Sequence, residues 1–196
     1  MRTKKDVVQE FRKSELLRAA RTVFSRSGFH DATIDDIAAE AGVAKGTVYL
    51  YFQSKQDIYL AALRDGIKML NDEMRTQAAT QGSAKDRLRN IIATKVSFFD
   101  ANLDFFQILQ SELSRVEAAI SQCRDLYFEQ VEIIEGVLQD GIQEGDIKKL
   151  NTKKAAFAVA DLTKGVVIQR VLGWSKTRMN DEIDFTLNLL WKGIAK

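Results

Sequence analysis

The chain has 196 residues, 45% hydrophobic and 29% charged, which is the composition of a globular protein with a core to bury. It contains no proline, which suits a protein built from long helices, because proline interrupts helix interiors. The single cysteine, Cys123, excludes an intrachain disulfide, and no apolar run is long enough to cross a membrane. We therefore expect a cytoplasmic protein with no membrane partner.

The net charge of +2 says little by itself, but its distribution is uneven. Residues 1–30 carry eight basic and three acidic side chains. Such a local excess fits an arm that lies along DNA, and the alternative is a solvated, disordered tail. The two interpretations are compatible, because basic arms often become ordered only on the phosphate backbone.

The first helix is predicted from about Arg12 to Ser27, with Gly28 ending it. Its core face follows from apolar residues at helical spacing, namely Leu16, Leu17, Ala20, Val23 and Phe24.

Residues 33–59 carry the signals of two short helices, a tight turn and the start of a longer helix. Thr33 and Asp36 have the spacing of a capping box, and Gly42 follows as the glycine expected just past a helix end. A second short helix is predicted over residues 44–50, and Ser54 begins the longer helix with another capping box. Two short helices joined by a turn containing glycine are typical of helix-turn-helix DNA-binding proteins.

The rest of the chain shows only helical periodicity, without a strand pattern or a repeat. After a break at residues 79–83, we expect helices that bring the total to about nine, over residues 83–101, 103–115, 121–144, 151–172 and from 180 or 181 onward. The fold class is therefore all-α.

The run AGVAKGTVYLYFQSKQDIYLAAL resembles the N-terminal signature of TetR-family transcriptional regulators, and the close match covers Leu16–Leu63. The resemblance implies a three-helix, helix-turn-helix DNA-binding domain over residues 1–53 and a helical ligand-binding and dimerisation domain over residues 54–196. One position departs from the pattern. Ala44 stands where the family often has Ser or Thr, so a helix cap worth ~1 kcal/mol is lost there.

The second helix of the motif is expected to enter the major groove of double-stranded DNA. Lys45, Thr47 and Tyr49 are predicted to face DNA, and Gly46 permits close approach of the backbone. Lys45 suits either a guanine edge or a phosphate, and both stay open.

Phosphate contacts are predicted at four further groups. Thr33 and Lys55 lie where helix N-termini can hold a phosphate, and the hydroxyls of Tyr49 and Tyr51 can reach backbone oxygens. The alternative for both tyrosines is simple packing. The side chains predicted to face the motif's own core are Val48, Leu50 and Phe52.

The resemblance also implies an effector pocket among the helices between residues 83 and 174. We predict a hydrophobic or planar effector, such as a lipid-like acid, because the candidate lining residues are mainly aromatic: Phe98, Phe99, Phe106, Gln110, Tyr127, Phe128, Arg170 and Trp174. Arg170 could meet a carboxylate or phosphate of the effector, and the alternative is an ion pair with Glu112 or Asp161. Ordinary core packing is the alternative for the aromatic residues.

The last two helices are rich in small and branched residues, and the penultimate one is apolar nearly all round. The resemblance implies that they form a four-helix bundle with a second copy, whereas a larger intrachain core is the alternative. The expected protein is a homodimeric repressor that binds a palindromic operator and is released by its effector. The competing interpretation is a helical interaction protein that has lost specific DNA binding.

No catalytic motif is present, since the chain lacks HExxH, a Gly-rich phosphate loop, GxSxG and a Cys–His pair. We therefore expect no enzyme and no catalytic residues. His30, the only histidine, has no Cys or His near it in the sequence, and we interpret it as a loop residue. No metal site and no cofactor are expected.

Overall fold

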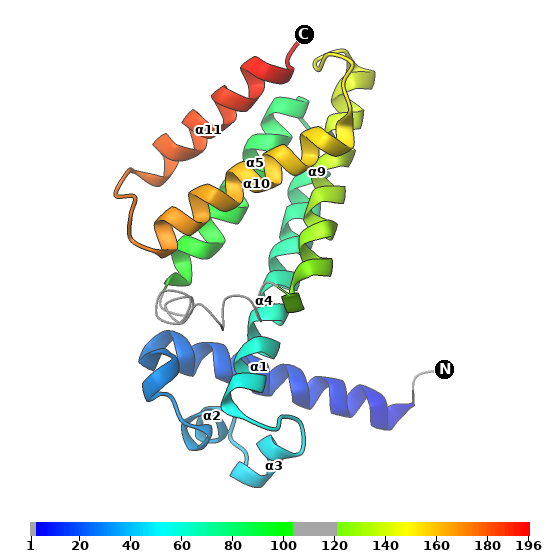
Figure 1. Ribbon diagram of the computed structural model, residues 1–196. Coiled ribbons are helices and arrows are strands. Elements are labelled where there is room, and N and C mark those ends of the chain that lie inside the picture. The colour runs from blue at the N-terminus through cyan, green and yellow to red at the C-terminus, as the bar shows by residue number, and fades with distance from the viewer. Residues whose placement is uncertain (1–2, 104–120) are drawn as a thin grey trace. The chain divides into compact units, whose positions relative to one another are not determined.

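The computed structural model describes residues 3–103 and 121–196, which form eight helices within those ranges (Figure 1). They fall into two compact units, one holding residues up to 66 and the other residues 67–101 and 123–196. The boundary between the units lies inside one helix, α4 (Lys55–Ala78). The all-α prediction is confirmed. The predicted boundary between a DNA-binding domain and a ligand-binding domain, at residues 53 and 54, stays a prediction.

The first unit begins with α1 (Lys4–Asp31), which starts eight residues before the predicted Arg12. The prediction relied on a buried face, and the first turns of α1 are exposed. A capping box starts them instead, because the Thr3 hydroxyl accepts from the amide of Asp6 and the Asp6 carboxylate accepts from the amide of Thr3. The basic arm is thus helical from Lys4. Gly28, with φ of 69°, kinks α1 instead of ending it as predicted, because the helix resumes as far as Asp31. His30 therefore lies in the last turn of α1, and its interpretation as a loop residue is wrong.

The core of the first unit forms around an aromatic cluster. Phe24 and Phe29 stack with their ring centroids 5.8 Å apart, and each ring meets Tyr59 edge-on at 5.4 Å. All three rings are buried, so they attach the start of α4 to the end of α1. Arg21 and Asp65 add an ion pair between the same two helices.

The predicted helix-turn-helix is present as α2 (Ile34–Glu40) and α3 (Lys45–Tyr49). Both hydrogen bonds of the Thr33–Asp36 capping box form, so the predicted start of α2 is confirmed. Gly42 has φ of 65°, and Val43 donates its amide to the carbonyl of Ala38 across the turn. The turn therefore holds α3 against α2.

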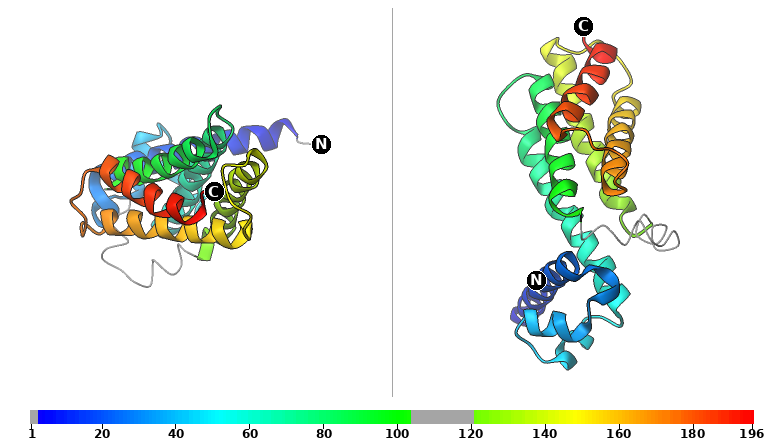
Figure 2. Two further views of the ribbon diagram at one scale, coloured as in Figure 1. Left: turned by 90° about the horizontal axis from the view of Figure 1, so that it is seen from above. Right: turned by 90° about the vertical axis from the view of Figure 1, so that its left-hand side faces the viewer.

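The second unit contains the end of α4 together with α5 (Ala84–Ala101), α9 (Arg124–Glu144), α10 (Thr152–Val171) and α11 (Met179–Ile194). Figure 2 shows α5, α9, α10 and α11 as a bundle, in which α10 packs on α9 and α5 and α11 packs on α5. One close approach needs glycine, because a Cβ at Gly141 would lie 2.6 Å from that of Ala84. Ser83 caps α5 and Asn151 caps α10, because their side chains accept from the amides of Asp86 and Lys154.

Two helix starts differ from prediction. Cys123 interrupts the helical run, so α9 begins at Arg124 rather than Ser121. The start of α11 is Met179, after an extended Arg178, with no capping side chain from Asn180 or Asp181. Asp181 and Glu182 lie instead in the first turn, where a negative charge is favourable beside the exposed amides.

Candidate nucleic-acid interface and effector-binding half

Helix α3 presents a short exposed surface made by Lys45, Gly46, Tyr49 and Leu50, while Thr47 is half-buried. Val48 and Phe52 are buried on the opposite side, as predicted. Leu50 was predicted to join them and that prediction is wrong, because its side chain is 81% exposed. The helix ends at Tyr49, so Leu50 follows the last turn and lies outside the packed face. An exposed leucine beside a predicted reading face is a feature that periodicity alone did not reveal.

Lys45 is paired within the chain. Its Nζ lies 2.8 Å from Oδ2 of Asp35, the second residue of α2. This hydrogen bond and the charge of Asp35 raise the pKa of Lys45, so the side chain is a cation at neutral pH. Both side chains are exposed, so this ion pair is weak and can exchange for a phosphate.

Gly46 has no structural reason to be glycine within the chain. A Cβ added there would meet nothing within 4 Å, and its φ is not positive. The same is true of Gly136, Gly165 and Gly193, so open space alone does not assign Gly46 a role, but it does leave the backbone of α3 accessible. At the start of α3, Ala44 has no side chain that could accept a hydrogen bond, so the first amides of the helix have no side-chain cap.

The predicted phosphate-binding groups are occupied to different degrees. The Thr33 hydroxyl donates to Asp36 at 2.7 Å, and this contact together with the Thr33 amide lowers the pKa of the Asp36 carboxyl. Lys55 donates to the carbonyls of His30 and Ala32, both at 2.9 Å, and lies over the Phe29 ring. Of three N–H bonds, Lys55 therefore uses two to hold the end of α1, and its phosphate contact stays a prediction.

Tyr51 is half-buried, and its ring is tilted against that of Phe52 with the centroids 6.5 Å apart. Both the packing and the phosphate-contact interpretations therefore remain for Tyr51, whereas Tyr49 is more exposed.

In the second unit, the structure brings together some of the residues predicted to line an effector pocket. Tyr127, Phe128 and Phe157 form an aromatic cluster across α9 and α10, with centroids 5.8 to 6.3 Å apart. Phe98 and Phe99 meet edge-on at the end of α5, 5.5 Å apart. Two predicted residues, Phe106 and Gln110, lie outside the described residues, as does Glu112. Trp174 does not join the aromatic residues, because it is 74% exposed beyond the end of α10.

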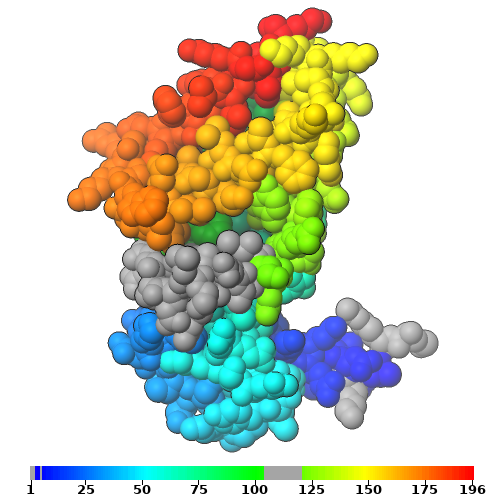
Figure 3. Space-filling model, viewed as in Figure 1, coloured from blue at the N-terminus to red at the C-terminus, as the bar shows by residue number. Residues whose placement is uncertain are grey.

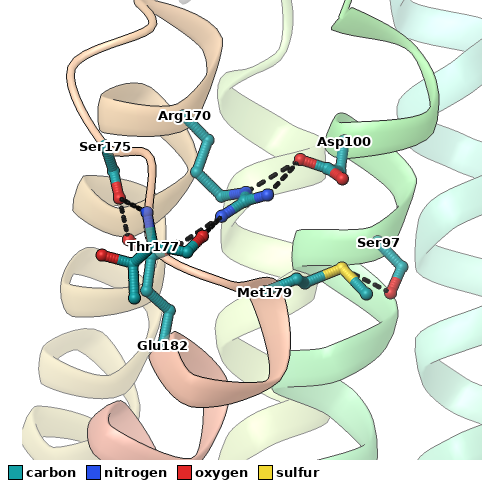
Figure 4. A network of polar contacts seen from close by, with 7 residues as sticks. All are labelled: Ser97, Asp100, Arg170, Ser175, Thr177, Met179 and Glu182. Carbon is teal, nitrogen blue, oxygen red and sulfur yellow. Dashed lines mark hydrogen bonds and ion pairs between the residues drawn. The ribbon is translucent and has the colours of Figure 1, made fainter.

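Arg170 is paired with two carboxylates in the network of Figure 4. Its Nε and Nη2 donate to Asp100 at 2.8 and 2.6 Å, and its Nη1 donates to Glu182 at 2.7 Å. Its side chain is only 13% exposed, so the network joins the ends of α5 and α10 to the first turn of α11. The ion-pair alternative is present, but the partner is not Asp161.

Asp161 belongs to a different group of polar residues. It accepts from the Tyr127 hydroxyl and from Lys164, each at 2.7 Å. Burial and the hydrogen bond to Asp161 raise the pKa of Tyr127 to about 12, so the phenol stays protonated and keeps donating. Lys164 also lies 5.0 Å from the centroid of the Tyr127 ring.

A buried lysine was missed by the sequence reasoning. Lys95 lies on the apolar stripe of α5, one turn after Ile91, and its side chain is 4% exposed. The sequence carried the signal, because Lys95 follows Leu88, Ile91 and Ile92 at helical spacing and is the charged residue in that series. Among the described residues, no group of three or more His, Cys, Asp and Glu side chains is arranged to hold a metal ion.

The outer faces of α10 and α11 expose large apolar side chains, and Figure 3 shows the two helices adjacent on one face in orange and red. Phe185 is 71% exposed, and the others are Leu162, Ile168 and Leu189. Single exposed apolar residues are normal in proteins, whereas a contiguous apolar patch is typical of an interaction site. Within residues 3–103 and 121–196, none of the helices has the length and apolar character that a bilayer crossing needs.

Two family models match the chain, one in its N-terminal part and one in its C-terminal part. Residues 16–62 match the model for bacterial regulatory proteins of the tetR family, and residues 81–168 match that for a tetracyclin repressor-like C-terminal domain.

Several characterised proteins are similar over most of the chain. The fatty acid metabolism regulator protein of Bacillus subtilis is 28% identical over 170 residues, covering 86% of this chain and 84% of its own. The transcriptional repressor KstR2 of Rhodococcus jostii is 28% identical over 160 residues, covering 81% and 78%.

Solved structures are similar as well. The regulator FadR of Bacillus subtilis in complex with stearoyl-CoA has a TM-score of 0.71 at 26% identity, covering 92% of this chain and 98% of that one. FadR of Bacillus halodurans has a TM-score of 0.73 at 22% identity, covering 91% and 94%, and this likeness concerns the fold.

Proposed function

Because this chain belongs to the TetR family of bacterial regulatory proteins and is a DNA-binding transcriptional regulator, we propose that it is a dimeric repressor released from its operator by a fatty acyl effector. Family membership also means that it is a regulator and not an enzyme. We further propose that it acts in the cytoplasm.

The exposed face of α3 is the proposed reading surface. The exposed Lys45 and Tyr49 carry this proposal, because they lie on the second helix of a motif that matches the tetR-family model, and Gly46 leaves room for a duplex to approach the backbone. Lys45 and Tyr49 lie on either side of Gly46 and supply a cation and a hydroxyl. On binding DNA, Lys45 exchanges Asp35 for a phosphate or a guanine edge, and Thr33, Thr47, Tyr51 and Lys55 add the proposed surrounding contacts.

A second copy is proposed to pack on the outer faces of α10 and α11. One α3 reads only a few base pairs, so specific binding needs two copies on a palindrome. The exposed Phe185, Leu189 and Ile168 support this arrangement, because burying them against a symmetric partner removes apolar surface from water.

The effector is proposed to be a fatty acyl thioester or a related acid. Two observations support this class: the aromatic side chains of α5, α9 and α10, and the stearoyl-CoA bound by the structurally similar FadR of Bacillus subtilis. The proposed lining residues remain Phe98, Phe99, Phe106, Gln110, Tyr127 and Phe128, whereas the exposed Trp174 and the doubly paired Arg170 have less support.

Release is proposed to pass along α4, since that helix begins beside α1 and continues into the second unit. In the second unit α4 is attached to α9 by polar contacts. The Asn71 amide donates to the carbonyl of Leu126 at 3.0 Å, and Gln130 donates to Asn71 at 2.9 Å. A ligand that prefers one position of α9 therefore biases α4, which is the differential interaction that coupling requires.

The test is fluorescence anisotropy with a labelled duplex taken from the region upstream of the protein's own gene. The wild type should bind specifically, and Lys45→Ala and Tyr49→Ala should bind more weakly with unchanged helical content. Lys68→Ala, at an exposed position on α4, is the matched control and should bind as the wild type does. Normal binding by both α3 variants would contradict the assignment of the reading surface.

A further inference from the structure

Lys95 is a buried cation that forms no ion pair with any of the described residues. It lies on the face of α5 formed by Ile91, Ile92 and Val96, which points into the helical bundle. Within the described part of the chain its single polar contact is a 3.4 Å hydrogen bond to the backbone carbonyl of Ala160 on α10. An ammonium carries three N–H donors, so two have no acceptor within the described residues and the third has a long bond.

Two other enclosed cations of the second unit, Arg87 and Arg170, each have carboxylate partners. Arg87 is held by Asp140 and Glu144, with N–O distances of 2.8 and 2.7 Å. Arg170 is likewise held by two carboxylates, as described above. Buried charges in proteins are normally paired, so an unpaired one is a candidate for function.

The described carboxylate whose charge acts on Lys95 is that of Asp161, and it is hydrogen-bonded to other groups. Asp161 follows Ala160, but its Oδ1 accepts from Tyr127 and Lys164. Burial is therefore the largest influence on the pKa of Lys95 and lowers it. The charge of Lys164 lowers this pKa further, and the charge of Asp161 raises it in part. The pKa of Lys95 is lowered to about 8. At neutral pH the side chain is still mostly a cation, and a new anion beside it would raise the pKa again.

We infer that Lys95 is an effector-binding residue, whose ammonium donates to the acyl oxygen of the ligand, either a carboxylate oxygen or a thioester carbonyl. The inference rests on the proposed acyl effector and specifies which group of this chain recognises its polar end. The chemistry fits, because two unused donors in an apolar interior bind an oxygen more strongly than they would in water. The acyl tail would then lie among the apolar and aromatic side chains of the same helices.

The two sources of an acyl oxygen differ in proton uptake. A carboxylate forms an ion pair, which raises the pKa of Lys95, so binding between about pH 8 and pH 10 takes up a proton. Affinity for the acid then falls as pH rises, because a neutral amine no longer attracts an anion. A thioester carries no charge at its carbonyl and causes much less uptake. The titratable groups facing Lys95 are Asp161 and Lys164 of α10, with Tyr127 of α9 bonded to Asp161.

The experiment is isothermal titration of the full chain with dodecanoate and with dodecanoyl-CoA, in two buffers of different ionisation enthalpy. The variants are Lys95→Met, which keeps the length and loses the charge, and Lys85→Met, which makes the same change at the second residue of α5. We expect Lys95→Met to weaken at least one ligand by about tenfold or more, and Lys85→Met to bind both normally. Proton uptake by the wild type with dodecanoate, absent in Lys95→Met, would identify the carboxylate as the partner.

Thermal unfolding separates ligand binding from a structural role. A lysine needed for the fold would lower the melting temperature when it is replaced, whereas removal of an uncompensated buried charge should leave the temperature equal or higher. If Lys95→Met binds both ligands as tightly as the wild type does, the inference about Lys95 is wrong, whereas the proposed acyl effector is still supported. If the wild type binds neither ligand, the proposed class of effector is wrong, and so is the inference about Lys95 that depends on it.

Discussion

The two units of the chain use their charged residues in opposite ways. In the helix-turn-helix, cations such as Lys45 are exposed and loosely paired, so they can exchange partners with a ligand in solution. In the second unit, Arg87 is buried and Arg170 is largely enclosed, and each is held by two carboxylates, whereas Lys95 is buried and forms no ion pair with the described residues. The contrast teaches that a paired buried charge stabilises the fold, while an exposed or an unpaired one is available to a ligand.

The sharpest test of the paired side is Arg170→Met. The change leaves the half-buried Asp100 and the more buried Glu182 without their cation, so we expect a loss of about 2 to 4 kcal/mol in the free energy of unfolding, measured by urea denaturation. Arg89→Met is the control, because its ion pair with Asp184 is exposed and should cost less than about 1 kcal/mol. Equal losses in both variants would remove the distinction between buried and exposed pairs.

Lys95→Met tests the unpaired side and should act in the opposite direction, stabilising the chain by about 1 to 3 kcal/mol near pH 7. The folded pKa of about 8 lies below the ordinary value of 10.5, so the cost of burying the charge is fully present below pH 8. Between those values the unfolded chain binds more protons, and wild-type stability rises with pH.

The advantage of Lys95→Met should therefore shrink across that range and vanish above it. Urea denaturation at several pH values measures this, and a constant difference from pH 7 to pH 10.5 would mean that Lys95 does not titrate as its surroundings imply.

Lys45→Ala should have a smaller effect, confined to DNA. Loss of one phosphate contact weakens operator binding by about tenfold and reduces the slope of log affinity against log salt by about 1. The melting temperature should not change, because the pair with Asp35 is fully exposed. A lower melting temperature with an unchanged salt slope would instead give Lys45 a structural role.

The smallest expected change is Ala44→Ser. Ala44 is the N-cap of α3 and makes no side-chain bond, so a serine hydroxyl could accept from the first amides of the helix. The free energy of unfolding should rise by about 0.5 to 1 kcal/mol. Operator binding by the same variant shows whether a phosphate needs those amides, since a cap that competes with DNA would weaken binding while stabilising the fold.

Local signals made the helix-turn-helix predictable from sequence. The Thr33–Asp36 box, Gly42 and the buried Val48 each follow from one residue type at one spacing, and all three are present. The capping box at Thr3 and Asp6 is an equally local signal. The predicted start at Arg12 depended on apolar residues at helical spacing, and the first turns of α1 have no such face. Leu50 could not be placed by periodicity, since α3 ends one residue before it.

The second unit was less predictable because its polar contacts join residues far apart in the chain. Arg170 and Asp100 are 70 positions apart, and no spacing rule connects them. Asp161, the ion-pair partner considered for Arg170, instead accepts hydrogen bonds from Lys164, three residues later in α10, and from Tyr127. The burial of Lys95 could be read from its place on the stripe of α5, but its lack of an ion pair with the described residues required the packed structure.

In the proposed function, an acyl ligand held in the second unit releases α3 from DNA. The most direct measurement is operator binding, followed by anisotropy, in the presence of increasing dodecanoyl-CoA for the wild type, Lys95→Met and Lys85→Met. We predict release of the wild type and of Lys85→Met over the same ligand range, and release of Lys95→Met only at about tenfold higher concentration or more. Undiminished operator affinity of a wild type that has bound the ligand would contradict the account.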